Sequence, residues 1–103
     1  MIVTIFRSRL APGVEDEYFP LAERMSKLAT AMPGYISHKG FVAEDGERVT
    51  LVVFETAETQ RAWQTHPEHL QAQKRGRERF YSDYHIQVCE VVRESQFKRD
   101  AKN

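Results

Sequence analysis

The sequence has a single cysteine, Cys89, so the chain cannot form a disulfide within itself. Glycine and proline are also sparse, with five and four residues, and there is no low-complexity tract that would indicate a fibrous or disordered chain. A chain of 103 residues buries enough apolar surface to fold without a disulfide or a structural metal. We therefore expect one domain, and we assign Cys89 no catalytic role because it lies in an apolar run.

An excess of charge of either sign is absent as well. Lys and Arg total 15 and Asp and Glu total 15, and no basic stripe that would neutralise phosphates is present. No apolar run approaches the length of a membrane span, and the first residues enter an alternating strand in place of a secretion signal. The expectation is a cytoplasmic protein that binds neither nucleic acid nor membranes.

The apolar pattern predicts the secondary structure of the chain. Runs rich in β-branched and aromatic residues predict strands over 2–9, 35–43, 48–55 and 84–93. Between the first two strands, apolar residues three and four apart predict a helix over 14–32. Pro33-Gly34 then ends this helix, and the acidic turn 44–47 joins the second and third strands as a hairpin.

A second helical region begins near Thr56 and breaks at His66-Pro67. Proline disfavours helical geometry in the residue before it but fits the first turn of a new helix, so two consecutive helices are expected. The spacing from Thr65 to Glu68 matches a capping box at the start of the second helix, which is expected to run to about residue 80 or 81.

Two helical crossovers around a central hairpin define an α+β fold of the ferredoxin-like split βαβ type, with a four-stranded antiparallel sheet. Residues 1–94 form the domain, and the mostly polar residues 95–103 are predicted to be a C-terminal tail. In the third strand, apolar residues occupy both the odd and the even positions, so both faces of this strand are expected to be buried, whereas the helices cover only one face of the sheet. A second copy would cover the other face, so we predict a homodimer with the two sheets packed face to face.

The segment 62–69 holds the only tryptophan and two of the four histidines. Its plain interpretation is structural, with Trp63 as a core anchor, His66 at a helix start and His69 at the surface. The following helix, however, has a rather polar stripe, which consists of His69, Leu70, Gln73, Arg77, Phe80 and Tyr81. A polar stripe beside a tryptophan indicates a small-molecule pocket between the helices and the sheet, with Tyr18, Met25 and Met32 as its apolar wall.

Several other kinds of site are not indicated. His66 and His69 are three residues apart, and no third ligand has a convincing spacing, so no metal site is predicted. The sequence has neither a nucleophile elbow nor a glycine-rich phosphate loop. His38 and His85 are expected at an edge or interface of the sheet, and Tyr81 and Tyr84 near the mouth of the pocket.

Over roughly residues 2–93 the chain resembles the antibiotic biosynthesis monooxygenase superfamily. The resemblance rests on Ser8-Arg9-Leu10 before a Pro-Gly turn, Pro33-Gly34-Tyr35, Trp63 followed by His66-Pro67-Glu68-His69, and Phe80-Tyr81-x-x-Tyr84. It implies a dimeric α+β barrel. Members of the superfamily include cofactor-free oxygenases that act on aromatic polyketides or quinols, haem-degrading enzymes and many small proteins of unknown role.

The haem-degrading members use an asparagine near the end of the first strand, a tryptophan, and a histidine about three turns later as iron ligand. Trp63 matches the tryptophan, but Ser8 stands at the asparagine position and Gln73 falls near the position of the ligand. Glutamine cannot replace imidazole on iron, so the resemblance disfavours haem degradation.

For a cofactor-free oxygenase, the resemblance implies that the pocket deprotonates a phenol or quinol, whose anion then reacts with dioxygen. In this scheme Trp63 stacks on the ring, His69 is the base and Arg77 stabilises the anion. The substrate-binding residues are then Ser8, His66, Gln73, Tyr81 and Tyr84, and no cofactor is needed. Two alternatives stay open: a non-catalytic homodimer that binds a small ligand, and an interaction module whose pocket is filled by side chains.

Overall fold

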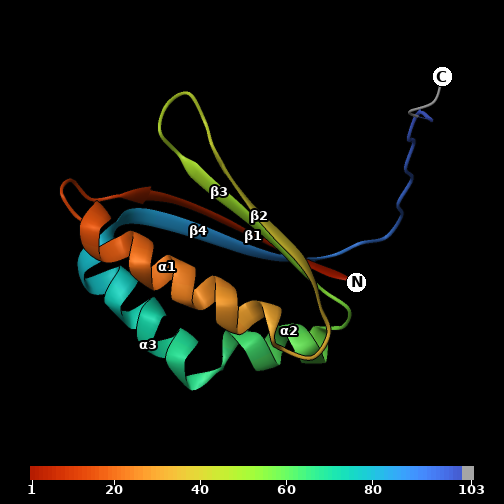
Figure 1. Cartoon of the computed structure of the whole chain (residues 1–103), viewed down its shortest axis with the longest axis horizontal. Helices are drawn as coiled ribbons and strands as arrows, with labels where there is room; N and C mark the ends of the chain where they lie inside the picture. Colours follow the sequence, from red (N-terminus) through yellow and green to blue (C-terminus); the bar gives the residue numbers. More distant parts are fainter. Residues whose placement is uncertain (101–103) are drawn as a thin grey trace.

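A computed structural model of the chain describes residues 1–100 (Figure 1). Four antiparallel strands form one sheet in the order β2-β3-β1-β4. The strands are β1 (Ile2–Leu10), β2 (Tyr35–Val42), β3 (Arg48–Phe54) and β4 (Tyr81–Glu90). The helices are α1 (Glu15–Thr30), α2 (Ala57–Gln64) and α3 (Pro67–Arg75), and α3 continues into one π-helical turn, η1 (Gly76–Phe80). This arrangement confirms the predicted ferredoxin-like α+β fold.

The three helices lie against one face of the sheet, which we call the inner face (Figure 1). Successive residues of a strand point to opposite faces, so the side chains that alternate with the inner ones form an outer face. It consists mainly of Val3, Ile5, Val49, Leu51 and Val53, with Ile5 opposite Leu51 and Val3 opposite Val53 in the register. Within residues 1–100 no helix covers this apolar outer face, as Figure 1 shows.

The buried core lies at the end of the sheet where α1 passes into β2. Phe54 is fully buried there against Ala29 and Trp63, and partly buried apolar side chains pack around these three. Gly34 lets the chain turn at this point: its φ is 80°, and a Cβ at this position would lie 2.6 Å from the Thr59 side chain. The sequence signal Pro33-Gly34 therefore marks a position where only glycine combines the backbone geometry with the close approach.

The break at His66-Pro67 is confirmed, but the predicted capping box is wrong. His66 itself is the N-cap of α3, and its ring Nδ1 accepts a hydrogen bond from the Glu68 backbone N–H at 3.2 Å. The carboxylate of Glu68 instead accepts two hydrogen bonds from the guanidinium of Arg24 on α1. A capping box does occur one helix earlier, between Thr56 and Thr59 at the start of α2.

The last strand is shifted from its predicted range of 84–93. It begins at Tyr81 because a bulge at Ser82 of β4 lets Tyr81 pair with Leu10 of β1, and the polar residues between Tyr81 and Tyr84 hid this in the sequence. It ends at Glu90 because its neighbour β1 begins at Ile2, the partner of Glu90. The Val91 N–H still donates to the Met1 carbonyl at 3.0 Å, after which the chain leaves the sheet (Figure 1).

We call residues 91–100 the C-terminal arm. They are extended and point away from the domain in Figure 1. Of the predicted tail over 95–103, residues 101–103 lie outside the described part of the chain. Among residues 1–100, no helix has the length and apolar content that crossing a membrane requires.

Candidate functional site

A cavity of about 260 Å³ lies between the inner face of the sheet and the three helices. This volume is at the small end of ligand-binding cavities. Its apolar wall includes Met25 of α1 and Val52 of β3, and its β4 side is formed by Tyr84, Ile86 and Val88. These three β4 side chains are 38%, 47% and 51% exposed, so the cavity is open to solvent along β4.

Six of the eight predicted site residues line this cavity: Trp63, His69, Gln73, Arg77, Tyr81 and Tyr84. The other two, Ser8 and His66, are not among its lining residues. Ser8 is buried within the sheet, where it pairs with Arg48 and Tyr84 in the register, and His66 is occupied in capping α3. Of the predicted apolar wall, Tyr18 and Met25 line the cavity, whereas Met32 packs against the core cluster.

His69 and Trp63 form a stacked pair at one end of the cavity. Their ring centroids are 4.0 Å apart and their planes are inclined by 13°. Because Trp63 is 7% exposed and packs in the core cluster, the indole holds the imidazole in place. One face of the indole is therefore already covered by His69, which leaves less of the ring for stacking on a ligand than the sequence suggested.

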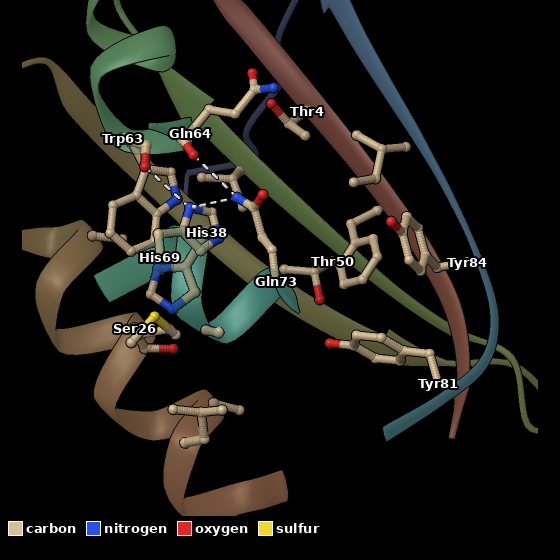
Figure 2. Close-up of a pocket in the computed structure, with 18 of the residues that line it drawn as sticks. Thr4, Ser26, His38, Thr50, Trp63, Gln64, His69, Gln73, Tyr81 and Tyr84 are labelled. Atoms are coloured by element: carbon tan, nitrogen blue, oxygen red, sulfur yellow. Dashed lines mark hydrogen bonds between the residues drawn. The ribbon is translucent and has the colours of Figure 1, made fainter. Parts of the chain in front are cut away.

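The hydrogen bonds of His69 define its tautomer. Its Nδ1 lies 3.0 Å from the Trp63 carbonyl oxygen, which can only accept, so Nδ1 carries the proton and Nε2 presents a lone pair. The Gln73 side-chain amide lies 3.3 Å from the same Nδ1 and donates to the Gln64 carbonyl at 3.1 Å. Figure 2 shows these contacts joining α2 and α3 at the cavity wall.

The half-buried position of His69 favours its neutral form. Burial lowers the pKa of the imidazole, the hydrogen bond to the Trp63 carbonyl opposes this shift, and the charge of His66 lowers the pKa further. At neutral pH the ring is therefore uncharged. A neutral imidazole with a free Nε2 is the form that accepts a proton.

This shift predicts a pH dependence of stability. The pKa of His69 is lower in the folded chain than its ordinary value of 6.5, so the unfolded chain binds the proton first as the pH falls. The stabilisation is thus complete above about pH 6.5 and is lost as the pH decreases towards the folded pKa. The unfolding free energy, measured with urea between pH 8 and pH 5, is expected to decrease as the pH falls. In a His69→Asn variant this decrease is expected to be smaller. His85→Asn, on the exposed part of β4, is the control and is expected to keep the full decrease.

Tyrosines form the other end of the cavity. Tyr81 makes edge-to-face contacts with Phe6, Tyr18 and Tyr84 at centroid distances of 5.3 to 5.9 Å. Burial raises the pKa of the Tyr81 hydroxyl, and the neighbouring Tyr18 raises it further. The hydroxyl is therefore a protonated donor, and in Figure 2 it points from β4 into the cavity.

The π-helical turn gives Tyr81 its position. A Cβ on Gly76 would lie 2.5 Å from Cε2 of the Tyr81 ring, so only glycine allows the ring to pack against this turn. A Gly76→Ala variant is expected to lose about 1–3 kcal/mol of unfolding free energy, because the ring must move. Thermal or urea unfolding measures the loss. Gly40→Ala is the matched control, since its Cβ would meet nothing closer than 3.9 Å. Equal losses in the two variants would contradict the packing argument.

Sequence reasoning missed several polar residues of the cavity, namely Thr4, Ser26, His38, Thr50, Gln60 and Gln64. His38 was expected at an edge or interface, and it does lie on the edge strand β2, with its Nδ1 2.5 Å from the Tyr35 hydroxyl. Simple alternation from Tyr35 would send it to the outer face. A bulge between Tyr35 and Ser37 reverses that parity, and no residue type in β2 signals the bulge.

Outside the cavity, ion pairs connect α1 to α3 and η1. Arg24 pairs with Glu68, and Glu17 pairs with both Arg75 and Arg79. The hydrogen bond from Arg79 and the charges of both arginines lower the pKa of the Glu17 carboxyl. Within residues 1–100, no group of three or more His, Cys, Asp or Glu side chains is placed to hold a metal ion.

The model of the antibiotic biosynthesis monooxygenase family matches residues 1–75, and the chain belongs to this family. The Bacillus subtilis protein YqjZ, which is uncharacterised, is 29% identical over 86 residues, covering 84% of this chain and 75% of that protein. Jasmonate monooxygenase of Pyricularia oryzae is 27% identical over 104 residues, covering 96% of this chain. The chain spans about half the length of that enzyme, 48%.

Solved structures agree on the fold. Rv0793 from Mycobacterium tuberculosis has a TM-score of 0.80 at 18% identity, covering 92% of this chain and 98% of the other. SnoaB from Streptomyces nogalater, a cofactor-independent oxygenase, has a TM-score of 0.75 at 15% identity, covering 90% and 94%. These likenesses confirm the ferredoxin-like fold. The predicted family is confirmed by the family model over residues 1–75.

Proposed function

We propose that the chain is a cofactor-independent monooxygenase that acts on a small aromatic phenol or quinol in the cavity. The observation that carries this proposal is the neutral, stacked His69, whose Nε2 is free to accept a proton. Two similar proteins support the proposal: SnoaB, which shares the fold of this chain, is named as a cofactor-independent oxygenase, and the enzyme with similar sequence is named as a jasmonate monooxygenase. The cavity of about 260 Å³ favours a substrate with one or two rings over a large polycycle.

In this mechanism His69 Nε2 takes the proton of the phenol. The electron-rich phenolate then transfers an electron to dioxygen, and Arg77, which lines the cavity, stabilises the negative charge. In a phenol, oxygen adds to the ring carbon opposite the hydroxyl, which carries a hydrogen atom, and in a 1,4-quinol it adds to a ring C–H beside a hydroxyl. One oxygen atom stays as the carbonyl of a quinone, the other leaves in water, and the substrate supplies the electrons. The protonated Tyr81 hydroxyl donates to the oxygen at the far end of the ring.

The homodimer is part of the same proposal. The outer face carries Val3, Ile5, Leu51 and Val53 as partly exposed apolar side chains on two adjacent strands. A continuous apolar face of this kind favours burial against its own copy, with two sheets stacked face to face. Light scattering at micromolar concentration is expected to give the mass of a dimer, and a monomer would contradict the arrangement.

Oxygen uptake tests the activity. The purified chain, treated with chelator, is assayed against a panel of one- and two-ring phenols and hydroquinones, with a Trp63→Phe variant beside it. Uptake well above autoxidation that falls in the variant supports the proposal, because a phenyl ring in place of the indole would no longer hold His69 in the same way. No uptake with any substrate would contradict it.

A non-catalytic dimer that binds a small ligand is the second candidate. The opening of the cavity along β4 favours it, because oxygen chemistry needs an enclosed, dry site whereas binding tolerates an open one. A change of Trp63 fluorescence on adding a ligand, without oxygen uptake, would identify this function.

A further inference from the structure

Strand β4 is the exposed edge of the sheet nearest the cavity opening. It pairs with β1 on one side, and within residues 1–100 no strand pairs with its other side. About every second residue of the ten-residue strand β4 directs its backbone N–H and C=O to this unpaired side, because the residues between them bond to β1. Together with exposed Ile86 and Val88, these groups form an edge of the kind that natural proteins normally cover. The unpaired edge of β4 therefore borders the open side of the cavity.

The C-terminal arm, in contrast to this uncovered edge, is a segment that within residues 1–100 has no surface to pack on. It carries apolar side chains and extends away from the domain. Val92 is 95% exposed and Phe97 is 81% exposed, although both belong to an extended segment that begins as a continuation of β4. The Arg99 guanidinium lies 5.6 Å from the centre of the Phe97 ring. Isolated exposed valines need no explanation, but an extended arm that ends in an exposed aromatic ring resembles a segment that docks elsewhere.

The arm is not built to fold back on its own strand. Residues 91–96 read VVRESQ and contain no glycine, proline, asparagine or aspartate, so Ser95 is the one residue among them of a type that often makes tight turns. Val91 and Val92 favour extended geometry. Figure 1 shows the arm running away from the domain, so its natural receptor is another molecule.

We propose that the arm of one chain pairs as a fifth strand along the free edge of β4 of a second copy, where Phe97 covers the open side of that copy's cavity. Ten extended residues reach roughly 33–36 Å, the length of the ten-residue strand β4. Strand β4 carries the acidic residues Asp83 and Glu90 and no Lys or Arg, whereas the arm carries three basic residues and two acidic ones, so the two segments have opposite net charge. The charged residues of the arm are Arg93, Glu94, Lys98, Arg99 and Asp100. Each cavity of a symmetric dimer is then completed by a residue of the other chain.

This inference rests on the proposed dimer but not on the proposed reaction. Its test is a disulfide between two different chains, both in a Cys89→Ser background. One chain carries Phe97→Cys and the other, with a larger tag, carries Ile86→Cys. The chains are mixed, allowed to exchange subunits and oxidised. A band of the mixed dimer on a non-reducing gel is expected, and its absence would overturn the proposal.

A matched pair of chains shows whether the contact is specific. Leu70 of α3 is 47% exposed, as Ile86 is, but lies on a helix away from the β4 edge. Leu70→Cys is therefore expected to cross-link to Phe97→Cys at least about tenfold less than Ile86→Cys does. Equal yields at the two positions would overturn the proposal.

The Phe97→Ala variant measures how much the Phe97 ring contributes to the affinity of the dimer. The dissociation constant of the dimer, from sedimentation, is expected to rise at least about tenfold, whereas Phe97→Leu keeps most of the affinity. A chain that ends at Glu90 and dimerises as tightly as the full chain would overturn the proposal. If the full chain is a monomer, dimer and arm docking fail together, while oxygen uptake by the monomer still tests the reaction separately.

Discussion

Replacing His69 with asparagine is expected to lower oxygen uptake with the best phenol by about 10²–10⁴-fold, the usual contribution of a general base. The asparagine amide can still donate to the Trp63 carbonyl, as Nδ1 of His69 does at 3.0 Å. It has no atom at the position of Nε2. The fold and the hydrogen bond are thus kept, and only the proton acceptor is removed.

A second variant separates proton transfer from hydrogen bonding. His69→Gln can place a polar atom near the position of Nε2, but an amide is not basic. Activity is expected to be lost in this variant as well, while ligand binding, followed by Trp63 fluorescence, is expected to survive in both. A glutamine variant with the uptake rate of the original chain would contradict the role of His69 as base.

Phe54→Ala is the substitution with the largest expected effect on stability. The Phe54 side chain is completely buried against Ala29 and Trp63, so its removal leaves a cavity in the core. The unfolding free energy is expected to fall by about 3–5 kcal/mol. This is a large part of the roughly 5–15 kcal/mol that stabilises a domain of this kind. Urea unfolding of the original chain and of the Phe54→Ala variant measures this loss of unfolding free energy.

Phe54→Leu is the control for this prediction. It keeps most of the volume and is expected to cost less than about 1.5 kcal/mol. Because Trp63 packs on Phe54, the alanine variant is also expected to release the indole and to change its fluorescence before unfolding. A loss under about 1 kcal/mol for Phe54→Ala would show that the surroundings collapse around the missing ring.

The fold could be predicted because each element has a local signal. Alternation marked the strands, helical spacing marked α1, and His66-Pro67 marked the break between α2 and α3. The limits of β4 could not be predicted, since they depend on where β1 begins and on the bulge near Leu10. The end of a strand is determined by its neighbour as much as by its own residues.

The lining of the cavity could be predicted on α3, η1 and β4, where Tyr81 and Tyr84 line it as expected, but not on β1, β2 and β3. The stripe from His69 to Arg77 follows from helical periodicity, which is regular enough to place side chains on one face. His38 faces the cavity only because β2 has a bulge. Ser8 lies on the inner face opposite Tyr84, but it is buried and is not among the lining residues. The stacking of His69 on Trp63 depends on how two separate helices meet, which spacing along one helix does not give.

The π-helical turn η1 has a consequence for how the length of this chain can change in evolution. Side chains in a strand alternate, so deleting one residue of η1 would shift β4 by one position. Tyr84, Ile86 and Val88 would then exchange faces with their neighbours, and the cavity would lose its β4 wall. The hairpin turn 43–47 has no such link to the cavity. Homologous chains are therefore expected to differ in length at that hairpin and to keep the number of residues between Pro67 and Tyr81 constant.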